Sequence, residues 1–244
     1  MTNETATVNT IAPLTNVSLC VSALELAISR PAHLPGMVSY YGPSGYGKSN
    51  GAAFAANKFN AYYVECKSTW TKKAFLSNVL KEMGMAQAKT IPEMTDQIAE
   101  QLALSGRPLI IDEFDHMVDK KAVEVVRDIY EGSNAPILLI GEERLEDNLT
   151  HWERFHNRIL KWVPAQPASA DDAGLLRKLY CQKVIVEDDI LNKLMEVTKG
   201  CVRRICVNLY NVQEFALENG MSQISLAEWG NQPFYTGKAP KRRV

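Results

Sequence analysis

The chain has 244 residues, of which 46% are hydrophobic and 23% are charged, and its formal net charge at pH 7 is −1. This length suits one large domain, or one domain and a smaller one, with a proper hydrophobic core. The composition is that of an ordinary soluble globular protein. A net charge near zero excludes attraction of nucleic acid by the overall charge, so any contact with nucleic acid has to come from a local basic patch.

The cysteines and the first residues give no indication of a zinc site, a leader or a membrane span. The five cysteines form no C-x-x-C pair, and none of the four histidines lies at zinc-finger spacing from them, so we expect core thiols in a reducing compartment. The start MTNETATVNT lacks a signal-peptide pattern, and VSLCVSALELAI is too short and too polar to span a bilayer. We therefore expect a cytoplasmic location and no membrane partner.

In chain order, a polar segment of residues 1–15 precedes a helix over about 16–30 and then five strand-like runs. The runs are MVSYYG, AYYVECK, RPLIIDEF, APILLIGE and ILKWVPA, and helical stretches separate the first four. Runs that are apolar with few interruptions are typical of parallel strands covered on both faces. Residues 16–167 are therefore predicted to be an α/β domain with a five-stranded parallel sheet and crossover helices.

After residue 167 the pattern becomes helical. SADDAGLLRKLY, VEDDILNKLMEVTKG and CVRRICVNLYNVQEFALENG are predicted to be helices, two of them with acidic residues near their starts, and no convincing strand occurs among them. We predict a small helical domain over residues 168–231 and a basic tail over 232–244, of a kind that is most often solvated. The basic residues of the tail are Lys238, Lys241, Arg242 and Arg243.

The first strand runs into GPSGYGKSN, which meets the pattern G-x-x-x-x-G-K-[ST]. Glycines allow a tight turn and let backbone N–H groups form an anion-binding nest, to which the next helix adds its positive dipole end. Lys48 is expected to reach the outer phosphates of ATP, and the Ser49 hydroxyl to hold Mg²⁺. A chance glycine turn is the alternative, but the flanking strand and alanine-rich helix favour a nucleotide site. Its residues are Gly42, Pro43, Ser44, Gly45, Tyr46, Gly47, Lys48, Ser49 and Asn50.

A pair of carboxylates ends the third strand in RPLIIDEFDHM. Asp112, at a strand end beside a phosphate loop, suits the Mg²⁺ site. Glu113 is expected to leave the strand on the other face and to polarise the water that attacks the γ-phosphate. The alternative is a strand that ends in a solvated acidic turn.

An α/β ATPase with a helical lid resembles the AAA+ family, and two further places support this resemblance. Arg158, in WERFHNRILKW, lies where AAA+ proteins supply an arginine finger to the next subunit's ATP, with Arg154 as the fallback. The Gly-x-x-Arg of TKGCVRRICVNLY looks like the sensor-2 element, which implies Arg203 over the phosphates. The alternatives are an arginine that pairs with Glu153 or a backbone carbonyl, and two exposed helix arginines.

One position departs from the AAA+ pattern. After the strand APILLI, members usually place Asn, Thr or Ser to orient the water, but this sequence continues with Gly141, Glu142 and Glu143. A carboxylate near the γ-phosphate repels it unless the carboxylate is turned away or paired. We therefore expect hydrolysis that is slow, or that needs DNA or a partner.

Two segments offer candidate contacts to DNA. In initiator-like AAA+ ATPases, the junction after the second strand, here ECKSTWTKKAFLSNVLKEMG, faces the central channel of the ring. Hydroxyls, lysines and helix N-terminal N–H groups attract phosphate backbones. The second segment, VDKKAVEVVRDIYE, places two lysines at another predicted helix start. Each lysine pair by itself is more often a solvated face. The candidate contacts are Thr69, Thr71, Lys72, Lys73, Lys120 and Lys121, with Ser68 beside them.

From about residue 17 to 225, the chain is similar to the AAA+ ATPases of DNA transposition, the family of the phage Mu B protein and the TnsC regulators. IIDEFDHM, LLIGEERL and RFHNRI carry this resemblance. It implies ATP and Mg²⁺, self-assembly into a ring or helical filament on duplex DNA, and a transposase that receives the target DNA. The Mu B protein has an extra N-terminal DNA-binding domain without a counterpart here, which leaves DNA binding to the ATPase body and the tail.

Two alternatives remain open. One is a helicase loader or clamp loader of similar build, although the ten or so polar residues at the start offer little for binding a partner. The other is a switch that does not hydrolyse ATP, in which ATP only sets the assembly state. Turnover measured with and without DNA separates this switch from the ATPase.

Overall fold

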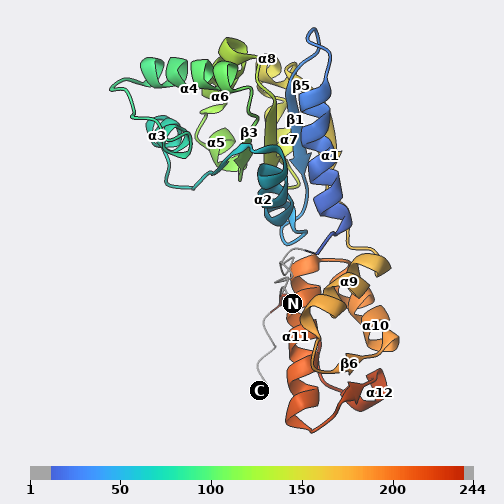
Figure 1. Cartoon of the computed structure of the whole chain (residues 1–244). Helices are drawn as coiled ribbons and strands as arrows, with labels where there is room; N and C mark the ends of the chain where they lie inside the picture. The colour runs from blue at the N-terminus through green and yellow to red at the C-terminus, as the bar shows by residue number, and fades with distance from the viewer. Residues whose placement is uncertain (1–11, 239–244) are drawn as a thin grey trace, which may run out of the picture. The chain divides into compact units, whose positions relative to one another are not determined.

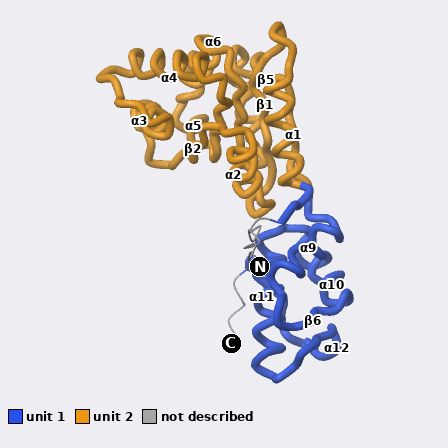
Figure 2. Tube along the Cα trace, in the orientation of Figure 1, with its two compact units in different colours: residues 1–15, 167–244 blue, residues 16–166 orange. Residues whose placement is uncertain are grey.

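The computed structural model of the chain describes residues 12–238. The chain divides into two compact units (Figure 2). Residues 16–166 form one, here called the sheet unit, and the other, the helical unit, takes its described residues from 1–15 and 167–244. Three of the basic residues of the tail lie outside the described residues, namely Lys241, Arg242 and Arg243.

The sheet unit contains a five-stranded parallel sheet in the order β2-β3-β4-β1-β5, which confirms the predicted α/β fold. Strand β1 lies between β4 and β5. After β1 the chain crosses to β2 at one edge of the sheet, returns through β3 to β4 beside β1, and ends with β5 at the other edge. The strands are β1 (Met37–Tyr41), β2 (Tyr62–Glu65), β3 (Leu109–Asp112), β4 (Ile137–Gly141) and β5 (Ile159–Pro164).

Side chains of the central strands alternate between two hydrophobic cores, because successive strand residues point to opposite faces. Ile137 and Leu139 belong to the core under α3, α4 and α6, whereas Leu138 and Ile140 belong to the core under α1 and α2 (Figure 1). The helices of the sheet unit are α1 (Thr15–Ser29), α2 (Lys48–Phe59), α3 (Lys72–Glu82), α4 (Ile91–Ser105), α5 (Asp115–Asp119), α6 (Val123–Ser133), α7 (Leu145–Leu149) and α8 (Glu153–His156).

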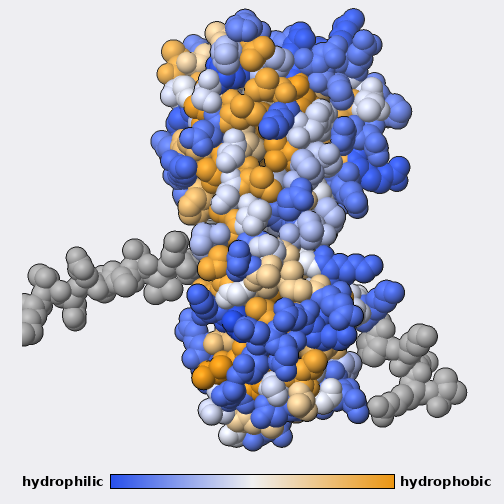
Figure 3. All heavy atoms as spheres, turned by 90° about the vertical axis from the view of Figure 1, so that its right-hand side faces the viewer, coloured by the Kyte–Doolittle hydropathy of each residue, from blue (hydrophilic) through white to orange (hydrophobic). Residues whose placement is uncertain are grey.

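Burial on both faces explains why the central strands are apolar almost throughout. Every residue of β3 and β4 is buried, whereas the residues of the edge strand β5 are only partly buried or exposed. On the side of the molecule where α1 lies, apolar side chains of the sheet unit gather between polar ones (Figure 3).

The helical unit contains helices where the sequence predicts them, and also a small sheet that the sequence did not predict. Strands β6 (Ile185–Val186) and β7 (Gln223–Ile224) pair in parallel. Two residues are too few to show a strand period, which explains why this sheet was missed. The helices of this unit are α9 (Ala170–Tyr180), α10 (Asp188–Thr198), α11 (Val202–Glu218) and α12 (Leu226–Trp229).

Candidate nucleotide-binding site

The loop between β1 and α2 places its three glycines in backbone conformations that side chains disfavour. The φ angle is 154° at Gly42, 83° at Gly45 and 84° at Gly47. A Cβ atom on Gly42 would lie 2.9 Å from the Cβ atom of Ala165, so this close approach to the end of β5 also requires glycine. The loop therefore turns sharply and delivers Lys48 as the first residue of α2.

The Lys48 ammonium group lies over the loop that precedes it. Its Nζ atom donates hydrogen bonds to the carbonyl oxygens of Gly42 (2.7 Å) and Pro43 (3.0 Å). Burial lowers the pKa of Lys48, and nearby negative charges oppose this shift. These charges belong, in order of effect, to Glu113, Asp112, Glu142 and Asp115. The site thus combines one half-buried cation with carboxylates from the ends of β3 and β4.

A buried asparagine of α1 ties the loop to β5. The Asn16 side-chain amide donates to the carbonyl oxygens of Tyr46 (2.8 Å) and Gln166 (2.7 Å), and its Oδ1 accepts from the Gln166 N–H (2.9 Å). Sequence reasoning missed this residue, because a polar residue at a helix start carries no signal of such distant partners. Asn16 holds the loop at Tyr46 in place.

Asp112 is the last residue of β3 and is only 1% exposed. Its Oδ1 atom accepts a hydrogen bond from the N–H of Glu113 (2.8 Å), and its Oδ2 atom accepts one from the hydroxyl of Tyr63 in β2 (2.9 Å). The sequence predicted Asp112 for this site but did not predict Tyr63. Two donors therefore fix the orientation of the carboxylate.

Glu113 adopts a left-handed conformation with φ 53°, which is uncommon for a residue with a side chain. The strand ends at Asp112, so the strand alternation expected for Glu113 does not apply and the turn sets its direction instead. The next N–H, that of Phe114, donates to the carbonyl oxygen of Ile140 (2.8 Å), which anchors this turn to β4. Such strained conformations are concentrated at functional sites.

The charge environment of Glu113 suits a proton acceptor. Burial raises the pKa of Glu113, the Asp112 and Glu142 carboxylates raise it further, and Lys48 and His116 act in the opposite direction. A carboxylate with a raised pKa is a stronger base than one in water.

The end of β4 is built differently from the pattern of AAA+ proteins. The N–H of Glu142 donates to Oδ2 of Asp115 (2.7 Å), and a Cβ atom on Gly141 would lie 2.4 Å from that oxygen. The half-buried Asp115 carboxylate and the Leu145 side chain occupy this space, so a larger residue at position 141 requires them to shift. The Glu142 side chain is exposed, yet its charge acts on both Lys48 and Glu113.

Arg158 lies at the amino ends of the strands, whereas the phosphate loop lies at their carboxyl ends. Its carbonyl oxygen accepts from the N–H of Met37, the first residue of β1, whereas the loop follows the last residue. Five strand residues separate these ends by roughly 16 Å. The Arg158 side chain is 41% exposed, and its Nη2 atom pairs with Glu131 of α6 at 3.0 Å, not with Glu153. The structure therefore does not bring Arg158 to its own loop.

The remaining predicted arginines are exposed. Arg154 lies in α8 of the sheet unit, and Arg203 is the second residue of α11 in the helical unit. The role of Arg203 over the phosphates stays a prediction.

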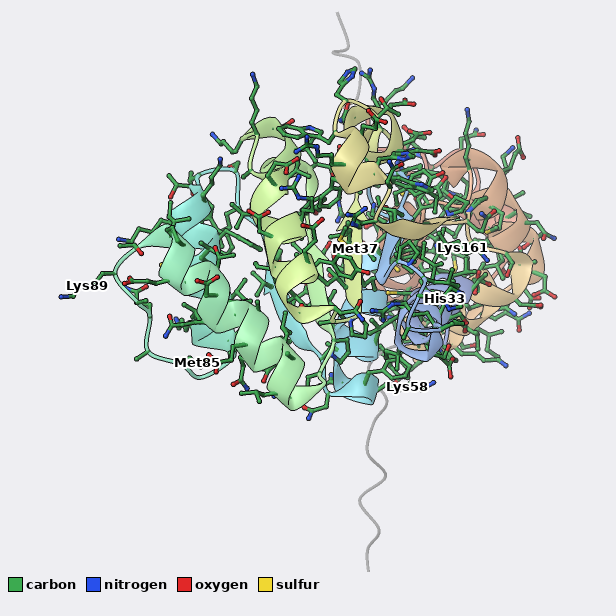
Figure 4. All side chains as sticks on the ribbon, turned by 90° about the horizontal axis from the view of Figure 1, so that it is seen from above. His33, Met37, Lys58, Met85, Lys89 and Lys161 are labelled. Atoms are coloured by element: carbon green, nitrogen blue, oxygen red, sulfur yellow. The ribbon has the colours of Figure 1, made fainter. Side chains whose placement is uncertain are left out.

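The predicted DNA-contact residues are all exposed. Thr71 caps α3 by accepting the N–H of Ala74 (3.2 Å), and Lys72 and Lys73 form the first turn of this helix. The Nζ atom of Lys73 donates to the carbonyl oxygen of Lys89 (2.9 Å). The Lys89 side chain itself points away from the sheet unit (Figure 4). Thr69 lies just before this turn.

Lys120 and Lys121 lie in the connection between α5 and α6, and not inside the start of α6 as the sequence suggested. The chain turns here because Lys121 is left-handed, with φ 52°. Lys121 lines a shallow hollow of about 420 Å³ together with Asp119 and Trp152. The neighbouring acid makes this pair a weaker candidate for a phosphate contact than Lys72 and Lys73.

The residues present fit a nucleotide with Mg²⁺. Within residues 12–238, no group of three or more His, Cys, Asp and Glu side chains is arranged to hold a metal ion alone. Mg²⁺ commonly takes one or two protein oxygens together with phosphate oxygens and water, and the buried Asp112 and the exposed Ser49 can supply such protein oxygens. None of the helices in the described part of the chain is both long and apolar enough to span a bilayer.

Comparison with known proteins agrees with this geometry. Residues 32–149 match the family model described as an AAA domain. A search of curated protein sequences returns no match to the chain.

Among solved structures, the chain is similar to the ORC2 protein of Aeropyrum pernix in its ADPNP–ADP complexes, with a TM-score of 0.66 and 18% identity over 87% of this chain and 65% of that one. The A. pernix ORC1 protein in complex with DNA has a TM-score of 0.62 and 15% identity, over 87% of this chain and 62% of that one. Domain III of the Thermotoga maritima replication initiation protein DnaA has a TM-score of 0.55 and 14% identity, over 90% and 91%. The chain thus spans less than two thirds of either ORC protein, and its fold is that of AAA+ P-loop ATPases.

Proposed function

We propose that this chain, in which residues 32–149 match an AAA domain, is an ATPase that assembles on duplex DNA and delivers it as a target to a transposase. The observation that carries the ATPase part is the meeting of Lys48, Asp112 and Glu113 at one edge of the sheet. In open α/β sheets, ligands bind beyond the carboxyl ends of the strands, where the strand order reverses. The transposition part rests on the resemblance of the motifs to the transposition ATPases.

In this proposal each side chain has one task. Lys48 and the loop N–H groups would hold the β- and γ-phosphates, and Ser49 and Asp112 would hold Mg²⁺. Bound Mg²⁺ supplies positive charge that offsets charge on the phosphate oxygens. Glu113 takes a proton from the water whose oxygen bonds to the γ-phosphorus atom, and its raised pKa favours this transfer. The bond between the γ-phosphorus atom and the β–γ bridging oxygen breaks, which releases ADP and phosphate.

Arg158 of a neighbouring subunit is the arginine finger that contacts the bound ATP in this proposal. Arg158 lies at the amino edge of the sheet, out of reach of its own phosphate loop, so it can act only on a nucleotide held by another copy. Its present partner, Glu131, is half-exposed, and the pair is solvent-accessible. Exposed pairs of this kind are weak, so Arg158 is available to exchange one anion for another.

Replacing Arg158 with alanine is expected to lower the ATP turnover of the assembled protein by roughly 10- to 100-fold. This is the cost of removing one hydrogen bond to a charged group. The ATP affinity of the monomer should not change. Mixing this variant with Glu113→Gln should restore part of the turnover, because some junctions then combine both intact halves. Arg154→Ala tests the fallback residue in the same way, and normal turnover in that variant assigns the finger to Arg158. If the mixture regains nothing, Arg158 does not act across a subunit boundary.

The DNA contact is tested through Lys72 and Lys73. Replacing both with alanine should weaken binding to duplex DNA about equally for every sequence, because phosphate contacts carry no base information. The slope of log affinity against log salt should flatten by about one unit for each phosphate that the variant no longer neutralises, since fewer counterions are released. Binding should be measured with ATP present over a range of salt concentrations.

The matched control for this test is the double change of Lys58 and Lys161 to alanine. Both lysines are exposed, and they lie in α2 and β5 of the same unit (Figure 4). The net charge changes by the same amount, so an equal loss of DNA binding in both double variants would indicate a general charge effect. Normal binding with an unchanged slope in the Lys72/Lys73 variant would move the contact elsewhere.

A second candidate function is favoured by one observation. The Glu142 charge acts on Lys48 and Glu113 from the position where AAA+ proteins usually carry a polar, uncharged residue. This repulsion toward the γ-phosphate favours a switch in which ATP sets the assembly state and hydrolysis is slow. Turnover that stays undetectable with DNA and ATP, together with ATP-dependent assembly in electron micrographs, would identify the switch.

A further inference from the structure

Strand β2 and the residue that follows it contact Asp112 at two points. The Tyr63 hydroxyl donates to Oδ2 of Asp112 at 2.9 Å, and the N–H of Cys66 donates to the carbonyl oxygen of Asp112 at 2.9 Å. Between them, Glu65 is the register partner of Asp112 in the β2–β3 ladder. One short strand therefore holds both the carboxylate and the main chain of this residue.

The contact from Tyr63 controls the direction of the carboxylate. The Asp112 side chain is buried, so its rotation is limited, and Tyr63 and the N–H of Glu113 each bind a different oxygen. A carboxylate offers about four lone-pair sites, so each oxygen keeps one free for Mg²⁺ or for a water molecule bound to it. The phenol thus sets the orientation without filling the site.

The hydrogen bond between these two side chains runs from Tyr63 to Asp112, because a carboxylate can only accept.

Strand β2 also leads directly to the proposed DNA-contact segment. Cys66 is the last residue tied to Asp112, and Ser68 to Lys73 follow after a single residue. Thr71, Lys72 and Lys73 begin α3, whose buried face packs into the core beside β2. Nine residues separate Tyr63 from Lys73, so a short stretch of chain joins the Asp112 contact to this segment.

We propose that Tyr63 is a positioning residue that orients Asp112 for Mg²⁺, and that β2 couples this carboxylate to the segment of residues 68–73. The coupling to DNA rests on the proposed function, whereas the orientation of Asp112 rests on the nucleotide site alone. Tyr63 acts through Asp112 in this role.

The test is Tyr63→Phe, with Tyr62→Phe as the matched control. Both changes remove one phenolic oxygen from adjacent residues of β2, but the Tyr62 hydroxyl accepts from Gln101 and has no contact with Asp112. The probe is a non-hydrolysable ATP analogue titrated at a series of MgCl₂ concentrations, with binding followed by calorimetry. Thermal unfolding of each variant establishes that it is folded.

We expect Tyr63→Phe to raise the Mg²⁺ concentration needed for half-maximal analogue binding by about tenfold, the usual cost of losing a partner of a metal-binding carboxylate. Binding without Mg²⁺ should stay as in the wild type, which a merely destabilised fold would not produce. Tyr62→Phe should follow the wild type in both conditions. A wild-type Mg²⁺ requirement in Tyr63→Phe would overturn the positioning role.

The coupling has its own measurement. Adding duplex DNA should change the analogue affinity of the wild type and of Tyr62→Phe, and this change should shrink at least severalfold in Tyr63→Phe. An equal DNA effect in all three proteins would overturn the coupling and leave the Mg²⁺ result standing. No analogue binding by the folded wild type would instead overturn the proposed function itself, so the two failures are distinguishable.

Discussion

Replacing Lys48 with alanine is expected to lower the affinity for ATP by more than about a hundredfold. The ammonium group is the cation at the head of α2, and it would give up its bonds to the Gly42 and Pro43 carbonyl oxygens for two phosphates. Each hydrogen bond to a charged group is worth about 1.5–3 kcal/mol, so losing two accounts for this factor. ATP-dependent coating of DNA should disappear with it.

Nucleotide titration by calorimetry measures this effect, and Lys58→Ala is the control for removing a lysine from the same helix. Burial lowers the pKa of Lys48, so its charge is costly to keep in the folded protein, and the alanine variant should remain folded. Unchanged ATP affinity in a folded Lys48→Ala protein would remove the basis of the nucleotide site.

Replacing Glu113 with glutamine should leave ATP bound and lower its turnover by roughly 10²- to 10⁴-fold, the contribution of a positioned general base. Glutamine keeps the size of the side chain and loses the carboxylate that accepts the proton. If ATP-bound subunits hold DNA, the variant should form longer-lived complexes with DNA. Faster dissociation from DNA would contradict a cycle in which ATP favours binding and ADP favours release.

The pH dependence gives a second test of Glu113. A base works only when deprotonated, so turnover should fall as the pH is lowered through its pKa. Burial and the Asp112 charge raise this pKa, so the fall should begin at a higher pH than an ordinary glutamate would give. The residual turnover of Glu113→Gln should lack this acidic limb, and an identical limb in the variant would assign it to another group.

Much of the sheet unit could be predicted because its signals are local. Five apolar runs, a glycine-rich turn before a helix and a carboxylate pair after a strand each lie within about ten consecutive residues. The physical causes act over the same range, since side-chain alternation, the conformational freedom of glycine and the helix dipole belong to neighbouring residues. The sequence therefore predicts one site for Lys48, Asp112 and Glu113, and the structure brings their charges together.

The sequence determined the type of each strand and helix of the phosphate site, and the tertiary structure alone decided what surrounds it. Asn16 bonds to Gln166 across 150 positions, and Tyr63 bonds to Asp112 across 49, so no local pattern announces either contact. The position of Arg158 at the amino ends of the strands likewise depends on the pairing of β5 with β1, which the sequence does not show. These partners depend on the strand order β2-β3-β4-β1-β5, which is fixed by the packing of helices on both faces and not by the residues next to them in the chain.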